Sequence, residues 1–277
     1  MNKVAAGMFV ALAVLFGAQA EIIIRDNDTI AFMGDSITEQ GNRPTGYVNL
    51  VMKGLEIAGV RNVQKIPVGI SGHKSDNMLA RLDKDVLART DKKTAQWMTF
   101  SCGVNDVWHG ARGVPFDGFT NNVTKIFDSC EKAGVKVIVL TPTMIYGDPN
   151  SDLNKKLAPY VSWLREESVR RKLACADLNA IMQEAIKTAG KEPGENLTSD
   201  GVHMAFMGNV MMAWGVLEAM GVPQAKMAEI LKAWYEMPGA FELKLSLSFR
   251  ERQELNRRLK SEKTDEATYL KGRLGFK

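Results

Sequence analysis

Five short apolar runs, separated by segments whose apolar residues recur at helical spacing, restrict the fold of this chain more than any other feature. Runs that are apolar on both faces are typical of parallel strands covered by helices on both sides. The helical segments between them provide the crossovers that parallel neighbours need. The sequence therefore predicts an α/β fold, a three-layer α/β/α sandwich with a parallel sheet of about five strands. The pattern does not encode the strand order, and we expect a flavodoxin-like order. The runs cover residues 30–33, 63–68, 97–102, 135–140 and 173–178.

The start of the chain has the pattern of a secretory signal peptide. Lys3 precedes an apolar run from Val4 to Phe16, and the small-x-small cleavage pattern Ala18-Gln19-Ala20 follows. An uncleaved membrane anchor is the alternative, but the run is short for a bilayer span of about 20 residues. We expect residues 1–20 to be removed after Ala20. The mature chain should then be secreted or periplasmic, with no membrane-spanning segment.

Composition indicates one sizeable globular domain. The chain has 277 residues, of which 45% are hydrophobic and 25% charged. Pro238-Gly239 marks a boundary, so we expect a main domain over 21–237 and a C-terminal appendage of unknown role over 238–277. Apolar residues alternate from Phe241 to Leu247 as in a strand. The net charge of +4 is small, and no basic stretch is interleaved with aromatic residues, so we expect no nucleic-acid partner.

The three cysteines predict neither a disulfide framework nor a metal site. They are Cys102, Cys130 and Cys175, and an odd number leaves at least one thiol unpaired in an exported protein. Each lies in an apolar run or on an apolar helix stripe, so we expect buried small hydrophobic side chains. Their spacing matches no metal site. We therefore expect no metal and no cofactor.

Polar residues follow three of the predicted strands where each one ends. Gly34-Asp35-Ser36 follows the first strand, Gly72 the second and Asn105 the third. Ligands bind beyond the carboxyl ends of the strands in an open α/β sheet, so these loops should meet at one edge. The backbone N–H groups of Ser36 and Gly72 and the Asn105 amide would suit an oxyanion hole. The Gly-Asp-Ser turn alone is equally compatible with a purely structural role.

A serine nucleophile needs a base, and the sequence offers three histidines. His203 lies three residues after Asp200, with Gly201 between them to allow a tight turn. That spacing lets the carboxylate reach Nδ1 of the imidazole, as in a Ser-His-Asp triad. His73 and His109 lie in loops at the same edge and are the alternatives. The Asp200 motif also fits a turn whose aspartate caps the next helix.

These motifs together resemble the blocks of the GDSL, or SGNH, hydrolase family. Gly34-Asp35-Ser36-Ile37 is similar to the first block, with Ile in place of the usual Leu. Gly72 resembles the second block, Gly103-Val104-Asn105-Asp106 the third and Asp200-Gly201-Val202-His203 the fifth. Each block alone is weak evidence for the family, but four blocks in the family's order are specific to it. They extend over most of the predicted 21–237 domain, and the tail after Pro238 lies outside the resemblance.

The resemblance implies the roles of these residues. Ser36 would be the nucleophile, His203 the base and Asp200 its partner, while Ser36, Gly72 and Asn105 would donate to the oxyanion. It implies a carboxylic ester hydrolase that works through a Ser acyl-enzyme without a cofactor. Family members include carbohydrate acetylesterases, lipases, lysophospholipases and thioesterases.

We expect a secreted serine esterase that deacetylates a carbohydrate, acting on a small-molecule or glycan ester. The alternatives are a lipase or lysophospholipase, an acyltransferase with the same triad, and a non-catalytic glycan-binding domain on the same fold. Loops 40–47, 107–116 and 144–150 should form the rim of the site. Within them Trp108, His109 and Tyr146 are candidates for substrate binding, or alternatively residues that only pack the loops. The sequence does not predict an oligomeric state.

Overall fold

The computed structural model describes residues 21–88, 95–189, 197–237, 257 and 260–261. The expected signal peptide and nearly all of the appendage, including the predicted strand at 241–247, lie outside these residues. Among the helices that the structure describes, none combines the length and the apolar character needed to cross a bilayer.

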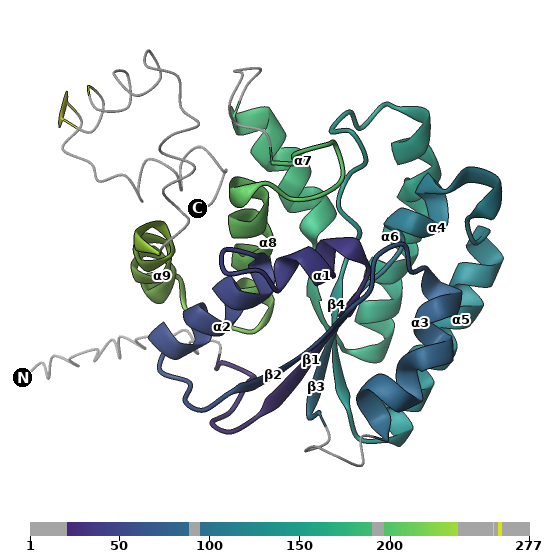
Figure 1. Ribbon diagram of the computed structural model, residues 1–277, viewed down its shortest axis with the longest axis horizontal. Helices are drawn as coiled ribbons and strands as arrows, with labels where there is room; N and C mark the ends of the chain where they lie inside the picture. The colour runs from purple at the N-terminus through teal and green to yellow at the C-terminus, as the bar shows by residue number, and fades with distance from the viewer. Residues whose placement is uncertain (1–20, 89–94, 190–196, 238–256, 258–259, 262–277) are drawn as a thin grey trace, which may run out of the picture.

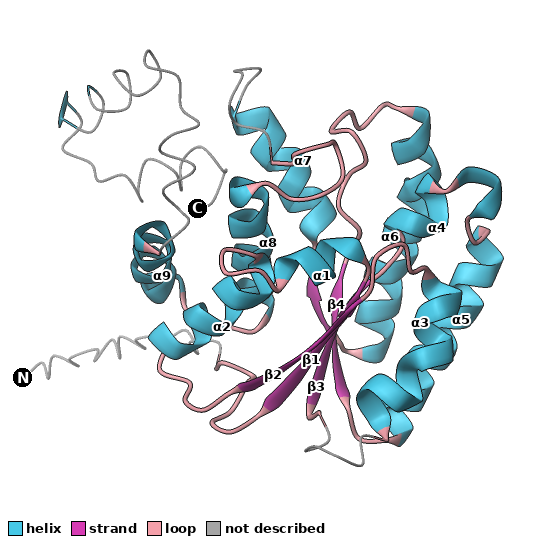
Figure 2. Ribbon diagram, in the orientation of Figure 1, coloured by secondary structure: helices cyan, strands magenta, loops and turns pink. Residues whose placement is uncertain are grey.

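A five-stranded parallel sheet forms the centre of the protein (Figure 2). Its order is β2-β1-β3-β4-β5, which is the flavodoxin-like order. The register aligns Gly34 with Gly69 and Met33 with Phe100, so the carboxyl ends of the first three strands lie at one edge. The predicted fold class is therefore confirmed. The strands are β1 (Thr29–Gly34), β2 (Gln64–Gly69), β3 (Trp97–Ser101), β4 (Lys136–Leu140) and β5 (Ala174–Ala176).

The strands differ in burial according to their place in the sheet. Every residue of β1 and β3 is buried, because both strands have neighbours and helices on all sides. β2 lies at one edge and exposes part of its length, and it contains Pro67, which an edge strand tolerates. The short strand β5 closes the other edge. Helices cover the sheet on both sides as expected, and the two edge strands β2 and β5 are less fully buried than the central strands.

Two helical layers cover the sheet (Figure 1). Helices α2, α7 and α8 pack together on one face with α9 outside α2, and α3, α5 and α6 pack on the other. The helices are α1 (Ser36–Gly41), α2 (Tyr47–Ile57), α3 (Ser75–Leu82), α4 (Val104–Trp108), α5 (Phe116–Lys132), α6 (Asp152–Arg171), α7 (Leu178–Ala189), α8 (Phe206–Ala219) and α9 (Gln224–Glu236). A π-helical turn at Asp83–Leu87 extends α3, and a 3₁₀ turn spans Gly110–Arg112.

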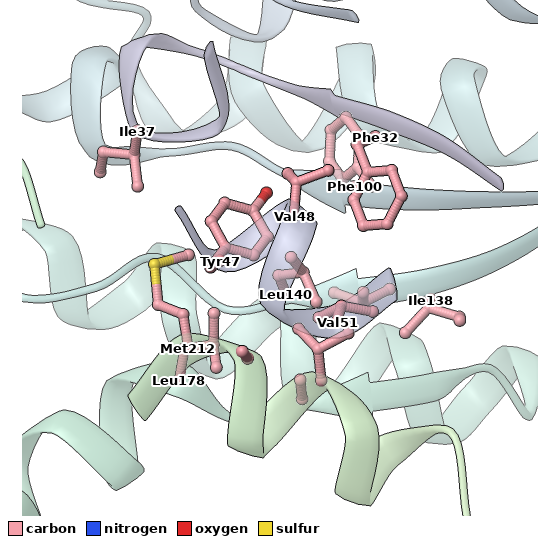
Figure 3. Packing of buried hydrophobic residues seen from close by; sticks show 14 of the residues in the cluster. Phe32, Ile37, Tyr47, Val48, Val51, Phe100, Ile138, Leu140, Leu178 and Met212 are labelled. Carbon is pink, nitrogen blue, oxygen red and sulfur yellow. The ribbon is translucent and has the colours of Figure 1, made fainter. Parts of the chain in front are cut away.

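The core joins strand and helix side chains from distant parts of the sequence. Figure 3 shows Phe32 of β1, Leu140 of β4, Val51 of α2 and Met212 of α8 in one buried cluster. Tyr47 is fully buried in the same cluster, and its hydroxyl lies 2.8 Å from the Thr38 hydroxyl. The cysteines are free thiols; Cys102 and Cys130 are buried as expected, whereas Cys175, in the edge strand β5, is only half-buried.

Two segments expected to be loops contain short helices. The polar stretch after Ser36 begins as α1, because the Asp35 carboxylate accepts the Ile37 N–H (2.9 Å) and caps the first turn. The segment after Gly103 forms α4, which Gly103 enters with a φ of +127°. Both helices are five or six residues long, too short for a periodic apolar pattern to predict them.

Candidate active site

Ser36 is the first residue of α1 and lies just beyond the end of β1. The turn before it requires glycine, since a Cβ on Gly34 would lie 2.0 Å from the Thr38 hydroxyl oxygen. The Asp35 side chain, itself buried, caps α1. Ser36 is only 7% exposed, so its hydroxyl is held in one place between the sheet edge and the loop that carries His203.

A chain of hydrogen bonds connects Ser36 to Asp200 through His203. The Ser36 Oγ atom lies 2.8 Å from Nε2 of His203. On the other side of the ring, Nδ1 lies 2.6 Å from Oδ2 of Asp200. The second carboxylate oxygen, Oδ1, accepts the backbone N–H groups of Val202 (3.0 Å) and His203 (2.8 Å). The imidazole therefore has a hydrogen-bond acceptor on one side and a hydroxyl on the other.

The Asp200 carboxyl is strongly stabilised in its charged form. Burial opposes ionisation, but hydrogen bonds from the imidazole and from two backbone N–H groups outweigh it and lower the pKa of Asp200 to about 2. A carboxylate at neutral pH keeps the ring proton on Nδ1 of His203. Nε2 is then free to accept the Ser36 proton.

A tight turn presents Asp200 and His203 on the same side. The Ser199 N–H donates to the His203 carbonyl oxygen (2.8 Å), and Thr198 forms an antiparallel bridge with Met204. Gly201 has a φ of +93°, a conformation that side chains with a Cβ rarely adopt. The sequence Asp-Gly-Val-His thus forms a turn through contacts between residues close in the chain.

The other two histidines have partners other than Ser36. His73 accepts a hydrogen bond at Nδ1 from Nε of Arg81 (3.1 Å). His109 lies beside Trp108, with ring centroids 6.1 Å apart. Of the three candidates for the base, His203 is the one hydrogen-bonded to Ser36.

The other two candidate oxyanion donors are Gly72, in the loop after β2, and Asn105, in the first turn of α4. Gly72 has a φ of +77°, and a Cβ at this position would enter open space. The Asn105 amide donates one hydrogen bond to the His73 carbonyl oxygen (3.1 Å), which leaves its second N–H available. The Glu39 carboxylate holds the loop before Gly72 by accepting the Ser71 N–H (2.8 Å). The loop that carries Gly72 is thus attached to both α1 and α4.

Two buried carboxyl groups adjoin the site, and neither received a role from the sequence. Burial raises the pKa of Asp35 to about 6 and also raises that of Asp106. Asp106 accepts the Ser75 N–H (3.1 Å) and the Ser75 hydroxyl (2.6 Å), and so fixes the start of α3 against α4. Both acids belong to motifs that resemble family blocks, and their position there was the signal that could have found them.

Aromatic side chains line the side of the site next to His203. The Trp108 ring lies 6.3 Å from the His203 ring, centroid to centroid, in an edge-on arrangement. Nε1 of Trp108 lies 3.2 Å from the Tyr146 hydroxyl. Tyr146 is 55% exposed and has a φ of +60°, while its N–H donates to the Gly201 carbonyl oxygen (2.8 Å). His109 adjoins this pair through Trp108.

Comparison with known families decides the assignment. The sequence profile of the GDSL-like lipase/acylhydrolase family matches residues 32–208, which include every block of the site. The chain belongs to the GDSL-like lipase/acylhydrolase family. It is accordingly a carboxylic ester hydrolase of the serine type. No curated protein sequence matches the chain.

Solved structures with this fold include other members of the esterase class. The acetylxylan esterase Axe2 from Geobacillus stearothermophilus superposes with a TM-score of 0.64 at 23% identity, covering 72% of this chain and 96% of Axe2. The α/β hydrolase LAE5 from the metagenome of Lake Arreo, Spain, gives a TM-score of 0.65 at 19% identity, covering 73% of this chain and 99% of LAE5. At these identities the similarity concerns the fold.

Proposed function

We propose that this GDSL-family esterase removes acetyl groups from a carbohydrate through an acyl-enzyme on Ser36. The observation that carries the proposal is the continuous hydrogen-bonded chain from Ser36 Oγ through His203 to Asp200. That chain supplies a base at the nucleophile and a fixed tautomer behind the base, which are the two requirements of a serine nucleophile.

In the first half of the reaction, Nε2 of His203 takes the Ser36 proton while Oγ attacks the ester carbonyl carbon. The carbonyl oxygen becomes negative, and the N–H groups of Ser36 and Gly72 and the free N–H of Asn105 stabilise it. The C–O bond to the alcohol then breaks, and the imidazolium gives its proton to the departing alkoxide. Asp200 stabilises the imidazolium throughout, as a carboxylate.

In the second half, a water molecule gives a proton to Nε2 of His203 and attacks the acyl-enzyme. The second tetrahedral intermediate collapses, the bond between Ser36 Oγ and the acyl carbon breaks, and the serine recovers its proton from His203. Acetate and the regenerated enzyme are the products. The exposed side chain of Asp200 and the open space beside Gly72 leave both ends of the site accessible to water.

The aromatic residues beside His203 support a sugar as the alcohol. A pyranose ring presents C–H groups on its face and hydroxyl groups at its rim, and the exposed ring of Tyr146 with the Trp108 edge suits both. The neighbouring structure Axe2 is an acetylxylan esterase, and a mutant of it is described as an acetyl-xylooligosaccharide esterase. The signal-peptide pattern of residues 1–20 supports an external polymer as the substrate.

The experiment is acetate release from acetylated xylo-oligosaccharides, with p-nitrophenyl acetate and p-nitrophenyl octanoate for comparison. Wild-type protein should release acetate from the sugar and prefer the acetyl over the octanoyl ester, and Ser36→Ala should abolish both activities. Activity that survives Ser36→Ala contradicts the acyl-enzyme. Preference for the octanoyl ester contradicts the carbohydrate assignment and favours a lipase.

The contribution of Tyr146 can be tested without disturbing its backbone. Asparagine tolerates a positive φ, so Tyr146→Asn removes the ring with little added strain. We expect a rise in KM for the acetylated sugar of a few-fold to about tenfold, as for loss of one aromatic contact. Tyr146→Phe is the matched control, since it keeps the ring and loses only the hydroxyl. Equal kinetics of Tyr146→Asn and wild type on the sugar would remove Tyr146 from the binding site.

A further inference from the structure

One guanidinium group connects the loops that carry the nucleophile and the oxyanion donors. Arg81 lies in α3, and its side chain is only 10% exposed. It donates from Nη2 to the Gly34 carbonyl oxygen (2.9 Å) and from Nε to Nδ1 of His73 (3.1 Å). Its third contact is an ion pair from Nη1 to the Asp85 carboxylate (2.8 Å). The planar fork of arginine places its donors on three separate nitrogen atoms and can reach these three acceptors at once, whereas the three donors of lysine lie on a single nitrogen.

Each end of this connection is directly attached to a group of the proposed oxyanion hole. The Gly34 carbonyl lies two residues before Ser36, and it also accepts the Ile70 N–H (3.1 Å) from the second loop. His73 immediately follows Gly72, and its carbonyl oxygen accepts the Asn105 amide. A shift of the Arg81 contacts would therefore change the relative positions of all three donors.

His73 serves here as an acceptor and not as a base. Its Nδ1 faces the Arg81 N–H, so it carries no proton in this arrangement. Burial and the charge of Arg81 lower the pKa of His73, and the acids Asp85, Asp76 and Glu39 oppose that effect. The neutral ring is thus the form that the surroundings favour, and its hydrogen bond to Arg81 persists at neutral pH.

We propose that Arg81 is a positioning residue for the oxyanion hole, acting through His73 and the Gly34 carbonyl. The proposal rests on the proposed function, since it assumes that Ser36, Gly72 and Asn105 act together on an ester. Asp85 neutralises the guanidinium, so the contribution of Arg81 is geometric and not a net positive field at the oxyanion. A positioning defect lowers kcat and leaves substrate affinity almost unchanged.

The test is Arg81→Gln, measured with p-nitrophenyl acetate. A displacement of about 1 Å in a catalytic group can cost on the order of 10²-fold in rate, and we expect a loss of kcat of that order. KM should change less than threefold. Phenylboronate forms a tetrahedral adduct with a reactive serine, so its affinity should fall by the same factor as kcat.

Arg171→Gln is the matched control. Arg171 is similarly buried, at 13% exposed, and forms ion pairs with Glu167 and Asp128. It is the last residue of α6, which runs from the carboxyl edge of the sheet back to the amino edge, so it lies away from Ser36. Arg171→Gln should lower the melting temperature and leave kcat and boronate affinity at the wild-type level.

If Arg81→Gln does not fold, Arg81→Lys and His73→Ala take its place with the same measurements. Arg81→Lys keeps the charge, but its donors lie on one nitrogen and do not span the three separate acceptors, and His73→Ala removes only the acceptor in the Gly72 loop. Each should lower kcat and boronate affinity together, by less than Arg81→Gln.

The outcomes separate the two proposals. Folded Arg81 variants with wild-type kcat, or with a loss that appears only in KM, overturn the positioning role while the esterase proposal stands. A wild-type protein that hydrolyses no ester and binds no boronate overturns the proposed function and the positioning role with it. Parallel losses in kcat and boronate affinity, absent from Arg171→Gln, support both.

Discussion

Replacing Asp200 with asparagine changes the group that faces His203 and leaves the shape of the loop almost intact. In wild type, Oδ1 accepts two backbone N–H groups and Oδ2 accepts the ring N–H on Nδ1. The asparagine oxygen must take the place of Oδ1. In the opposite orientation the amide NH₂ would face two backbone donors, and each lost bond costs about 1–3 kcal/mol.

The asparagine NH₂ group therefore points at Nδ1 of His203. The ring can only accept there, so its proton moves to Nε2, and Nε2 then donates to Ser36 in place of accepting its proton. The wrong tautomer costs about 10⁴-fold in kcat in another Ser-His-Asp triad. We expect a similar loss here, equivalent to about 5.5 kcal/mol of transition-state stabilisation.

Asp200→Ala provides a sharper comparison. The Asp200 side chain is 51% exposed, so water can replace the carboxylate and accept the Nδ1 proton. The productive tautomer is then available, and the expected loss is smaller than that of Asp200→Asn. Alanine should thus be the more active variant.

The assay is hydrolysis of p-nitrophenyl acetate at neutral pH, with Ser36→Ala as background and thermal unfolding to establish that each variant is folded. A loss below tenfold in Asp200→Asn would refute the triad assignment. A loss in Asp200→Ala greater than that in Asp200→Asn would refute the tautomer argument and indicate that the carboxylate charge dominates.

Three stability predictions follow from buried groups near the site, each measured by urea or thermal unfolding. Folding raises the pKa of Asp35 to about 6, so its contribution to stability is largest below pH 4 and is lost as the pH rises to 6. Asp35→Asn keeps the oxygen that caps α1 and should stabilise the protein at pH 7.5, by on the order of 3 kcal/mol, but not at pH 4. Gly201→Ala should destabilise the protein by more than the strain of about 1–2 kcal/mol that a Cβ-bearing residue has at positive φ. The added cost arises because the new Cβ would lie 2.2 Å from the Tyr146 ring. Thr38→Val leaves the buried Tyr47 hydroxyl without this partner and should cost about 1–3 kcal/mol, whereas adding Tyr47→Phe should recover most of the loss. The Asp35 argument is contradicted if Asp35→Asn has the same effect on stability at pH 4 and pH 7.5. The Gly201 argument is contradicted if Gly201→Ala leaves the stability unchanged. The Thr38 argument is contradicted if the double variant is less stable than Thr38→Val.

Local sequence patterns were sufficient to predict the fold and the turns of the site. Continuous apolar runs identify strands buried on both faces, and all five predicted strands are present in the predicted class of sheet. Gly34 before Ser36 and Gly201 after Asp200 identify turns, because their backbone and contacts leave no space for a side chain. The contact of Gly34 with Thr38 and the positive φ of Gly201 depend on neighbours within a few residues, so the chain encodes them directly, whereas the contact of Gly201 with Tyr146 belongs to the tertiary structure.

Contacts between distant segments needed the tertiary structure. The Arg81 side chain reaches Gly34, 47 residues away, and Ser36 meets His203 across 167 residues. No local pattern distinguishes Arg81 from an ordinary solvent-exposed arginine of an amphipathic helix. Its burial follows from the place of α3 beside the carboxyl ends of β1 and β2.

The sequence by itself determined which backbone segments form the sheet and which loops carry a serine, an acid and an imidazole. Strand order and helix packing decided which of three histidines faces Ser36, that Trp108 lies against His203, and that one arginine holds two loops together. The physical reason is the distance along the chain between the groups that interact. Turn geometry and strand burial depend on nearest neighbours along the chain, whereas a hydrogen bond between loops depends on the register and order of the strands that place them.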